Sequence, residues 1–453
     1  MLTQKLRLKS PLRRNLLSPK GVKSNFAPNA SIMRRLYSLL FYSITPLIVL
    51  RLWWRSLKNP AYRARWSERF GFYNQTYKQN VIWFHAVSVG ESEALFPLIA
   101  LIKLKHPTIP LLITTTTPTG SARVKSVLGE SVAHVYLPYD LPDVVERFLS
   151  EFKPKIAVIL ETEIWPNLYH ACFDKKIPLY LVNACLSEKS VRGYQKISSL
   201  AISTLNAVTK IATQTDHDKL NFIKIGANAN SIENLGNIKF DVRVEESVLF
   251  QGKALKNTLF EKRFVFLAAS THEGEEELLL NCYKTIKEKI PNLILVIAPR
   301  HPERFNHVAT VAKKAQLKSV TRTSQKVCDD EVDVFLIDTL GELKLFYASA
   351  DVAFVGGSFV PVGGHNLLEP AAVGVPILVG AEVKNIALVI EKLLSAQAVI
   401  QCENVAELQI KIVELYNQPQ LRDKLISNAK HVVAQNQGAT QRIYHLLNLE
   451  SAT

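Results

Sequence analysis

The chain has 453 residues, of which 47% are hydrophobic and 21% charged, a composition that fits a folded protein of two or three domains and excludes disordered and collagen-like chains. Its five cysteines show no CxxC pair or other metal-ligand spacing, so we expect neither a disulfide framework nor a structural zinc ion, and we infer a reducing compartment. The formal net charge of +15 would favour nucleic-acid binding if it were spread over the whole protein.

The positive charge is concentrated at the amino end. Residues 1–70 hold 15 basic residues and one acidic residue, whereas the remaining 383 residues hold 40 basic and 39 acidic ones. The body of the protein therefore lacks the basic surface that nucleic acid requires, and we expect no nucleic-acid partner.

Leu36 to Leu50 form a fifteen-residue run without a charge, flanked by arginines and by Trp53 and Trp54. The run is shorter than the ~20 residues of a usual spanning helix, and it contains Pro46. Its flanks favour an anchor in or across the inner membrane, held by anionic lipid on the cytoplasmic face. A buried helix of a soluble domain remains an alternative. A secretory signal fits less well, because no small-residue cleavage site follows Leu50.

Four segments are expected along the chain. Residues 1–32 are interpreted as a basic, unstructured lead, with Met33 as an alternative start, and 33–56 as the membrane anchor segment. Two domains follow, over 57–240 and 241–453, and we expect the last helix of the second to pack back on the first.

From Val81 onward, short apolar runs alternate with amphipathic stretches. Strands buried on both faces have such continuous apolarity, so the pattern predicts parallel sheets covered by helices on both sides. The expected strands form two series: 81–87, 110–117, 134–139, 155–161, 178–184 and 210–215, then 263–270, 292–299, 332–338, 351–357, 375–380 and 398–402. The predicted fold is α/β, with two tandem Rossmann-like, doubly wound domains facing a cleft at the carboxyl ends of their strands.

Unusual motifs stand at these strand ends, in the order HAVSVGE (85–91), TTTTPTG (114–120), YLPYD (136–140), ETEIWPN (161–167), GNIKFD (236–241), STHEGEEE (270–277), PRHPERF (299–305), LGEL (340–343) and FVGGSFVPVGGHNLLEP (354–370). Over about residues 33–445 the chain resembles the Kdo transferases. These are membrane-associated GT-B type glycosyltransferases that move 3-deoxy-D-manno-octulosonic acid (Kdo) from CMP-Kdo to lipid A precursor (lipid IVA) in lipopolysaccharide biosynthesis. The resemblance implies an inverting transferase, and we expect no cofactor and no metal site.

Glu91 stands where a strand ends and a helix begins. A glutamate in the first turn of a helix commonly stabilises the exposed N–H groups and the helix dipole. It can also serve as a general base if it lies within hydrogen-bond reach of an acceptor hydroxyl. The residues alone leave both roles open, and the resemblance implies that Glu91 is the catalytic base.

Glu161 and Glu163 follow a fully apolar strand, and either could cap the helix that begins near Trp165. The resemblance implies that Glu161 and Lys239 stabilise the transition state. A cation at Lys239 makes chemical sense, because the donor carries a carboxylate beside its anomeric carbon and a phosphate leaving group. A solvated linker lysine is the alternative for Lys239.

The second domain is interpreted as the nucleotide half. Arg300 can fork onto a phosphate or a base edge. Two glycine pairs, 356–357 and 363–364, are expected to let the backbone approach a ligand, and a helix start at His365-Asn366 offers N–H groups to a phosphate. A tight turn and an ordinary N-cap with an acidic first turn are the alternatives. The resemblance implies CMP contacts from Pro299, Arg300, Leu340, Gly341, Glu342, Asn366, Leu367, Leu368 and Glu369.

Two acidic motifs receive plainer interpretations. Asp216-His217-Asp218 matches an acidic pair that holds a metal ion in some sugar-nucleotide enzymes, but its position at a helix start favours capping. His272 could orient a phosphate or pack at the strand end, and the acidic residues 275–277 behind it are expected to form a solvated helix face.

The chain departs from the family pattern at two places. Cys185 stands where relatives usually have arginine, and 381–386 keep only the asparagine, Asn385, of a usual His-Thr-Phe-Asn-Phe run. These changes affect the acceptor side and cleft closure rather than the base or the CMP loop. A sugar-nucleotide epimerase and a non-catalytic, nucleotide-binding membrane adaptor are the alternative functions.

Overall fold

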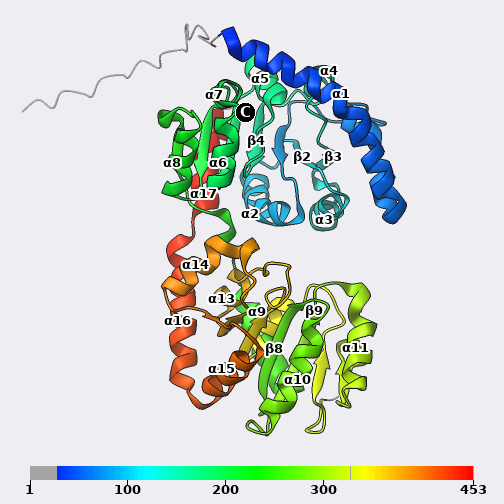
Figure 1. Cartoon of the computed structure of the whole chain (residues 1–453), viewed down its shortest axis with the longest axis vertical. Helices are drawn as coiled ribbons and strands as arrows, with labels where there is room; N and C mark the ends of the chain where they lie inside the picture. Colours follow the sequence, from blue (N-terminus) through cyan, green and yellow to red (C-terminus); the bar gives the residue numbers. More distant parts are fainter. Residues whose placement is uncertain (1–27, 327, 452–453) are drawn as a thin grey trace, which may run out of the picture.

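The computed structural model describes residues 28–326 and 328–451, and in these it contains two seven-stranded sheets, each at the centre of one α/β domain. The paired strands of both sheets are parallel. The two domains lie end to end, with helices on both sides of each sheet (Figure 1). The predicted fold class is confirmed.

The amino-terminal domain has the strand order β3-β2-β1-β4-β5-β6-β7. Its strands are β1 (Ile82–His85), β2 (Leu111–Thr115), β3 (Ala133–Tyr136), β4 (Ile156–Leu160), β5 (Leu179–Ala184), β6 (Lys210–Thr213) and β7 (Ile232–Asn234). Its helices are α1 (Pro28–Lys58), α2 (Val89–Lys105), α3 (Pro118–Leu128), α4 (Pro142–Phe152), α5 (Pro166–Asp174), α6 (Glu188–Gln195), α7 (Ser198–Leu205) and α8 (Asp216–Lys224).

The carboxy-terminal domain has the strand order β10-β11-β9-β8-β12-β13-β14. Its strands are β8 (Phe264–Thr271), β9 (Leu293–Pro299), β10 (Ser319–Thr321), β11 (Val334–Leu336), β12 (Val352–Val355), β13 (Ile377–Val379) and β14 (Ile400–Gln401). The helices that follow the domain junction are α9 (Glu246–Leu259), α10 (Glu275–Lys287), α11 (Phe305–Lys314), α12 (Leu343–Ser349), α13 (Leu368–Val373), α14 (Ala387–Ser395), α15 (Val405–Asn417), α16 (Pro419–Asn436) and α17 (Ala439–Leu447).

All twelve predicted strands are present. Their continuous apolarity has the expected cause, which is burial on both faces of the sheet. Trp83 and Phe84 are neighbours in β1 and both are fully buried, but they belong to hydrophobic clusters on opposite faces of the sheet. Two further strands, β7 and β10, were not predicted. Each has three residues and lies at or near a sheet edge, where fewer side chains are buried and the apolar signal is weak.

The chain crosses between the domains twice. At the first crossing, the short 3₁₀ helix η5 (Ile238–Phe240) places Ile238 in the core of the first domain and Phe240 in the core of the second. At the second crossing, α16 packs in the second domain while α17 returns to pack on α2 of the first. The carboxylate of Asp241 joins the two crossings, because it accepts hydrogen bonds from the amides of Gly438 and Thr440, each at 2.5 Å.

Helix α1 lies along the outside of the first domain (Figure 1). It begins at Pro28, so the expected unstructured lead is wrong for 28–32, while its remainder lies outside the described residues. Helix α1 continues through Pro46, and Ser38 donates a hydrogen bond to Asn167 of α5 at 3.1 Å. Over Ala30–Leu57 it is long and apolar enough to cross a membrane.

Candidate active site

Glu91 lies in the first turn of α2, directly beyond the carboxyl end of β1. Its carboxylate accepts hydrogen bonds from the Val87 amide (2.8 Å) and the Ser88 hydroxyl (3.0 Å), while the Ser88 hydroxyl caps the Glu91 amide. Burial raises the pKa of Glu91, and the negative charge of Glu161 raises it further. The residue therefore caps its helix and also has the raised pKa that suits a general base.

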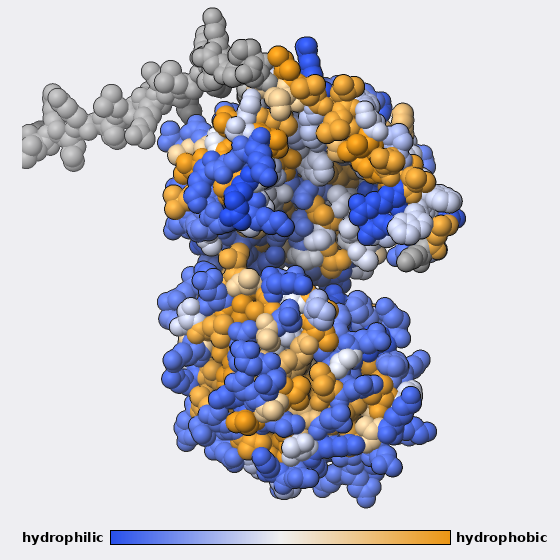
Figure 2. Space-filling model, viewed as in Figure 1, coloured by the Kyte–Doolittle hydropathy of each residue, from blue (hydrophilic) through white to orange (hydrophobic). Residues whose placement is uncertain are grey.

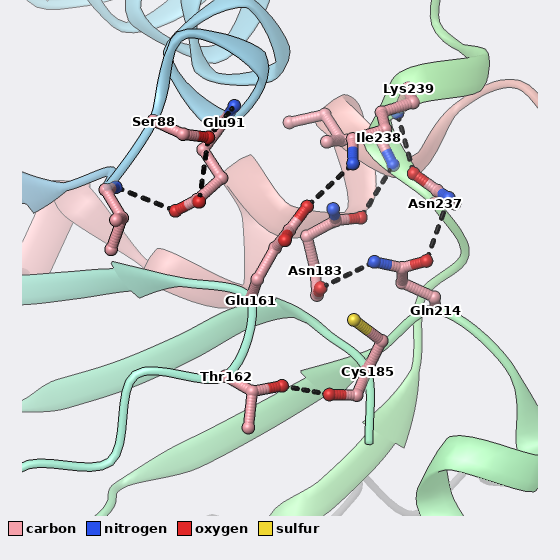
Figure 3. Close-up of polar contacts among 11 residues, drawn as sticks. Ser88, Glu91, Glu161, Thr162, Asn183, Cys185, Gln214, Asn237, Ile238 and Lys239 are labelled. Carbon is pink, nitrogen blue, oxygen red and sulfur yellow. Dashed lines mark hydrogen bonds and ion pairs between the residues drawn. The ribbon is translucent and has the colours of Figure 1, made fainter. Parts of the chain in front are cut away.

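Glu161 and Lys239 form an ion pair at the same edge of the sheet. Glu161 is the first residue after β4, and its φ of +56° is in the left-handed region. Its side chain therefore does not follow the alternation of the strand's side chains between the two faces of the sheet. Its Oε1 lies 2.8 Å from Nζ of Lys239, which η5 carries. Figure 3 shows Glu91, Glu161 and Lys239 gathered in one region, although they come from three distant segments.

Glu163 is a further acidic residue in this region. Burial raises its pKa to about 7, and the charges of Glu91 and then Glu161 add to this, while a hydrogen bond from the Trp165 indole (2.9 Å) opposes it. Burial and the charges of Glu91 and Glu161 therefore favour the protonated form of Glu163 up to about pH 7.

The proton on Glu163 makes the stability of the fold depend on pH. A carboxyl whose pKa is raised by folding favours the folded state below its unfolded pKa, and this contribution is lost as pH rises through about 7. Glu163→Gln removes the titrating carboxyl, and with it the loss of stability as pH rises. We expect the variant to gain about 1–3 kcal/mol relative to the parent chain between pH 5 and pH 8, measured by urea unfolding. Parallel pH curves for the two chains would contradict this.

The departure at Cys185 does not introduce a reactive thiol. Burial raises the pKa of Cys185 to about 12, so the thiolate is scarce at neutral pH. Its carbonyl accepts a hydrogen bond from the Thr162 hydroxyl, which connects the loops after β4 and β5 (Figure 3). Cys185 is thus a structural neighbour of Glu161.

Asp216-His217-Asp218 opens α8 as expected, but the residue that caps the helix is the one before this motif. The N-cap is Thr215, whose hydroxyl accepts from the Asp218 amide at 3.0 Å. The Asp218 carboxylate accepts from the Leu186 amide at 2.9 Å and from the Thr215 hydroxyl at 2.5 Å. Asp218 therefore joins α8 to the loop after β5.

In the second domain, Arg300 and Glu342 differ in how freely they can meet a ligand. Pro299 is buried at the end of β9, and the side chain of Arg300 is exposed. The Glu342 carboxylate is held by the fork of Arg322, with contacts of 2.9 and 3.2 Å, and this ion pair lowers the pKa of Glu342. Beside Glu342, Gly341 is exposed and Leu340 is 73% exposed, so the two residues form an open surface.

The loop between β12 and α13 is held together by its own backbone. Both amides of the second glycine pair, Gly363 and Gly364, donate to the carbonyl of Gly357, at 3.0 and 2.7 Å. The amides of the first pair also have partners, because that of Gly356 donates to the Ala269 carbonyl and that of Gly357 to the Glu275 carboxylate. These amides are therefore used inside the domain, and the tight-turn alternative describes the glycines better than contact with a ligand.

Asn366 and Leu367 precede α13, which begins at Leu368, so the expected helix start at His365-Asn366 is wrong. The Asn366 side chain accepts from the Leu368 amide at 2.9 Å. Leu367 and Leu368 have buried side chains in the core, so only their backbone could reach a ligand. Burial raises the pKa of Glu369, and its carboxyl also interacts with Lys344 and, across the domain junction, with Glu93 and Arg123.

The expected solvated face over residues 275–277 is wrong for Glu275 and Glu276, whereas Glu277 is exposed as expected. Glu275 and Glu276 are buried, and the Glu275 carboxylate accepts from the amides of His272, Gly357, Ser358 and Phe359 at 2.8–3.1 Å. Glu276 pairs with Arg304 at 3.1 Å. No residue pattern distinguished Glu275 from an exposed glutamate, because three of its four amide donors lie in the loop after β12, more than 80 residues away.

His272 packs against His365, with their Nε2 atoms 2.7 Å apart and their rings stacked. Burial lowers the pKa of both imidazoles, that of His365 to about 4, and the charge of Arg300 adds to this. The two rings are therefore neutral at pH 7, one donating to the other.

Comparisons with known proteins agree with this geometry. Residues 64–242 match the model of the 3-deoxy-D-manno-octulosonic-acid transferase (kdotransferase) family, and 251–432 match that of the glycosyl transferases group 1. A 3-deoxy-D-manno-octulosonic acid transferase of Haemophilus influenzae is 37% identical over 91% of this chain and 98% of that protein. One from Bordetella pertussis is 32% identical over 90% of this chain and 97% of that protein.

Among solved structures, a UDP-GlcNAc 2-epimerase of Neisseria meningitidis has a similar fold, with a TM-score of 0.53 and 17% identity over 82% of this chain and 99% of that one. The two doubly wound domains give the fold, and the two matched models identify the chain as a two-domain glycosyltransferase. The relatives that match over nearly their whole length show that the chain belongs to the 3-deoxy-D-manno-octulosonic acid (Kdo) transferase family.

Proposed function

We propose that this Kdo transferase moves Kdo from CMP-Kdo to a lipid A precursor, with Glu91 as the general base. The observation that carries the proposal is the cluster of Glu91, Glu161 and Lys239, which three separate segments bring to the carboxyl edge of the first sheet. The cluster combines a carboxyl of raised pKa with a lysine that can meet negative charge, the two functions that this transfer needs.

In the proposed reaction, a hydroxyl of the acceptor attacks the anomeric carbon of Kdo from the side opposite CMP. The bond from carbon to the acceptor oxygen forms as the bond to the phosphate oxygen breaks. Glu91 receives the hydroxyl proton, and the bonding electron pair leaves with CMP. The transition state is oxocarbenium-like, and inversion follows from the single displacement.

Lys239 and Glu161 would stabilise the charges that develop in the transition state. Negative charge grows on the departing phosphate, and the donor has a carboxylate beside the reacting carbon, so the Lys239 ammonium is attractive to both. The pairing of Lys239 with Glu161 holds the ammonium at this edge before substrate binds. Glu161 also offers a negative charge to the oxocarbenium-like carbon.

The second domain would hold the CMP moiety. The exposed Arg300 can pair with phosphate, the surface at Leu340 and Gly341 can meet the base, and Glu369 can accept from ribose hydroxyls. The charges of Glu93 on α2 and of Arg123 act on the Glu369 carboxyl, which supports a position of this part of the second domain near α2, the helix that carries Glu91.

Arg300→Ala and Glu369→Gln should each weaken CMP binding by about 1.5–3 kcal/mol, because each removes a charged hydrogen bond to the nucleotide. This corresponds to a roughly 10- to 150-fold higher Kd by calorimetry. Arg192→Ala, which removes an exposed arginine of α6 in the other domain, should leave the Kd unchanged. Parental affinity in both variants would place the nucleotide elsewhere.

The transfer is tested directly by CMP release from CMP-Kdo with and without lipid A precursor. We expect rapid release only when the acceptor is present, together with a Kdo-modified lipid seen by mass spectrometry. Equal release without acceptor, or CMP binding without any turnover, would contradict the proposal and favour an epimerase-like enzyme or an adaptor.

Helix α1 would hold the enzyme at the cytoplasmic face of the inner membrane. Its exposed side chains include Leu36, Leu39, Leu40, Leu47, Leu50, Trp54 and Leu57, whose spacing of three or four residues places most of them on one face of the helix. Figure 2 shows this orange surface along the upper domain. The flanking arginines would meet anionic headgroups.

The double variant Leu39→Gln, Leu47→Gln should bind vesicles of anionic phospholipid at least roughly tenfold more weakly, because each lost leucine removes about 1.5–3 kcal/mol of apolar burial in the bilayer. Co-sedimentation with vesicles measures the effect. Leu104→Gln is the matched control, because Leu104 is 80% exposed but lies on α2. Equal losses in control and double variant would contradict the anchor.

A further inference from the structure

Asn183 lies in an irregular step of β5 and is fully buried. The pairing of β5 with β6 shifts register between Leu181 and Ala184, and Asn183 has a left-handed φ of +52°. Asparagine tolerates this backbone better than most residues. The shift takes its side chain out of the strand's alternation and directs it at the segment that joins the domains (Figure 3).

Hydrogen bonds from β5 and from the loop after β6 fix that segment immediately before Lys239. The Asn183 Oδ1 accepts from the Ile238 amide at 3.0 Å. Gln214 donates to the Asn183 carbonyl and accepts from the Asn237 side chain, each at 2.9 Å, and Asn237 in turn accepts from the Lys239 amide at 2.9 Å. Figure 3 shows these bonds leading from the sheet to Lys239.

Lys239 needs such support because of its position. It lies between Ile238, in the core of the first domain, and Phe240, in the core of the second. Any rotation between the domains acts on the backbone between these two anchors. The bonds from Asn183 and Gln214 tie the lysine to the domain that carries Glu91 and Glu161.

The choice of asparagine is costly for stability. Its Nδ2 is buried and finds no hydrogen-bond partner among the described residues, and an unpaired buried donor lowers the stability of the fold. An aspartate would supply the same acceptor for the Ile238 amide. It would, however, place a buried negative charge against the residue that directly precedes Lys239. Asparagine is the neutral acceptor that leaves the lysine free to pair with Glu161 and with substrate.

We propose that Asn183, assisted by Gln214, is a positioning residue for the transfer reaction and acts through Lys239. The inference rests on the proposed role of Lys239 in transfer. It assigns to Asn183 no contact with substrate. Its function is to keep the Lys239 ammonium aligned with the reacting centre, where a displacement of about 1 Å can cost up to roughly 10²-fold in rate.

A double-mutant cycle tests this. Asn183→Gly keeps the left-handed backbone and removes the acceptor for Ile238. We expect it to lower kcat by roughly tenfold to hundredfold, with little change in KM for CMP-Kdo. In a Lys239→Gln background, the same change should cause no further loss, because its effect passes through the lysine. Gln214→Ala should repeat the pattern, and it decides the question if the glycine variant fails to fold.

Asn80→Gly is the matched control, because Asn80 has a φ of +58° but is exposed and precedes β1. It should retain the parental kcat. Equal losses from Asn183→Gly in the parental and Lys239→Gln backgrounds, or parental kcat in both Asn183→Gly and Gln214→Ala, would overturn the inference. A parental kcat in Lys239→Gln alone would instead overturn the proposed role of Lys239, so the two failures are distinguishable.

Discussion

Glu91→Gln should lower kcat for Kdo transfer by about 10²- to 10⁴-fold while leaving CMP affinity nearly unchanged. The amide cannot accept the proton of the acceptor hydroxyl, and Glu91 lies on the domain opposite the proposed nucleotide site. In the parent chain the rate should rise as pH rises through the raised pKa of Glu91, because only the carboxylate is a base. The variant should lose this rise.

Glu407→Gln provides a matched control for the capping role of Glu91. Glu407 occupies the same position in the first turn of α15, where it accepts from the Glu403 amide at 2.8 Å and its own amide is capped by Asn404 at 3.0 Å. Both variants lose a similar cap, worth about 1 kcal/mol. If transfer by Glu91→Gln falls no further than transfer by Glu407→Gln, Glu91 is a helix cap and not the base.

Lys239→Gln is expected to lower kcat by roughly 10²- to 10³-fold, the usual cost of removing one group that stabilises developing negative charge. The Kd for CMP alone should change less than kcat, because CMP lacks the Kdo carboxylate, one of the two proposed partners of the lysine. Single-turnover kinetics with CMP-Kdo and lipid A precursor would measure the chemical step.

The control for Lys239→Gln is Lys210→Gln. Lys210 also forms a partly exposed ion pair in the first domain, with Glu233 at 2.7 Å, but it lies on β6. Loss of an exposed pair costs little stability, about 0–1 kcal/mol, so neither variant should unfold. A kcat in Lys239→Gln that matches that of Lys210→Gln would remove Lys239 from the mechanism.

The sequence by itself determined the two sheets and the places where chemistry could occur. Strands such as β1 and β8 are buried on both faces, and that environment demands local apolar runs, which can be read without knowing the partners of each strand. The same reasoning placed Glu91 and Glu161 at carboxyl ends. The motifs also identified the family, and relatives that are 32% and 37% identical confirm it.

Only the tertiary structure decided which of these residues meet. Glu161 and Lys239 are 78 positions apart, and they pair because β4, β5 and β6 are neighbours in the sheet and because Glu161 has a left-handed backbone. No sequence pattern indicates that Glu275 is buried, because three of the four amides that bond to it lie in the loop after β12. Local patterns record how deeply a segment is buried, whereas contacts between distant polar side chains depend on strand order and on individual backbone angles, which no local pattern records.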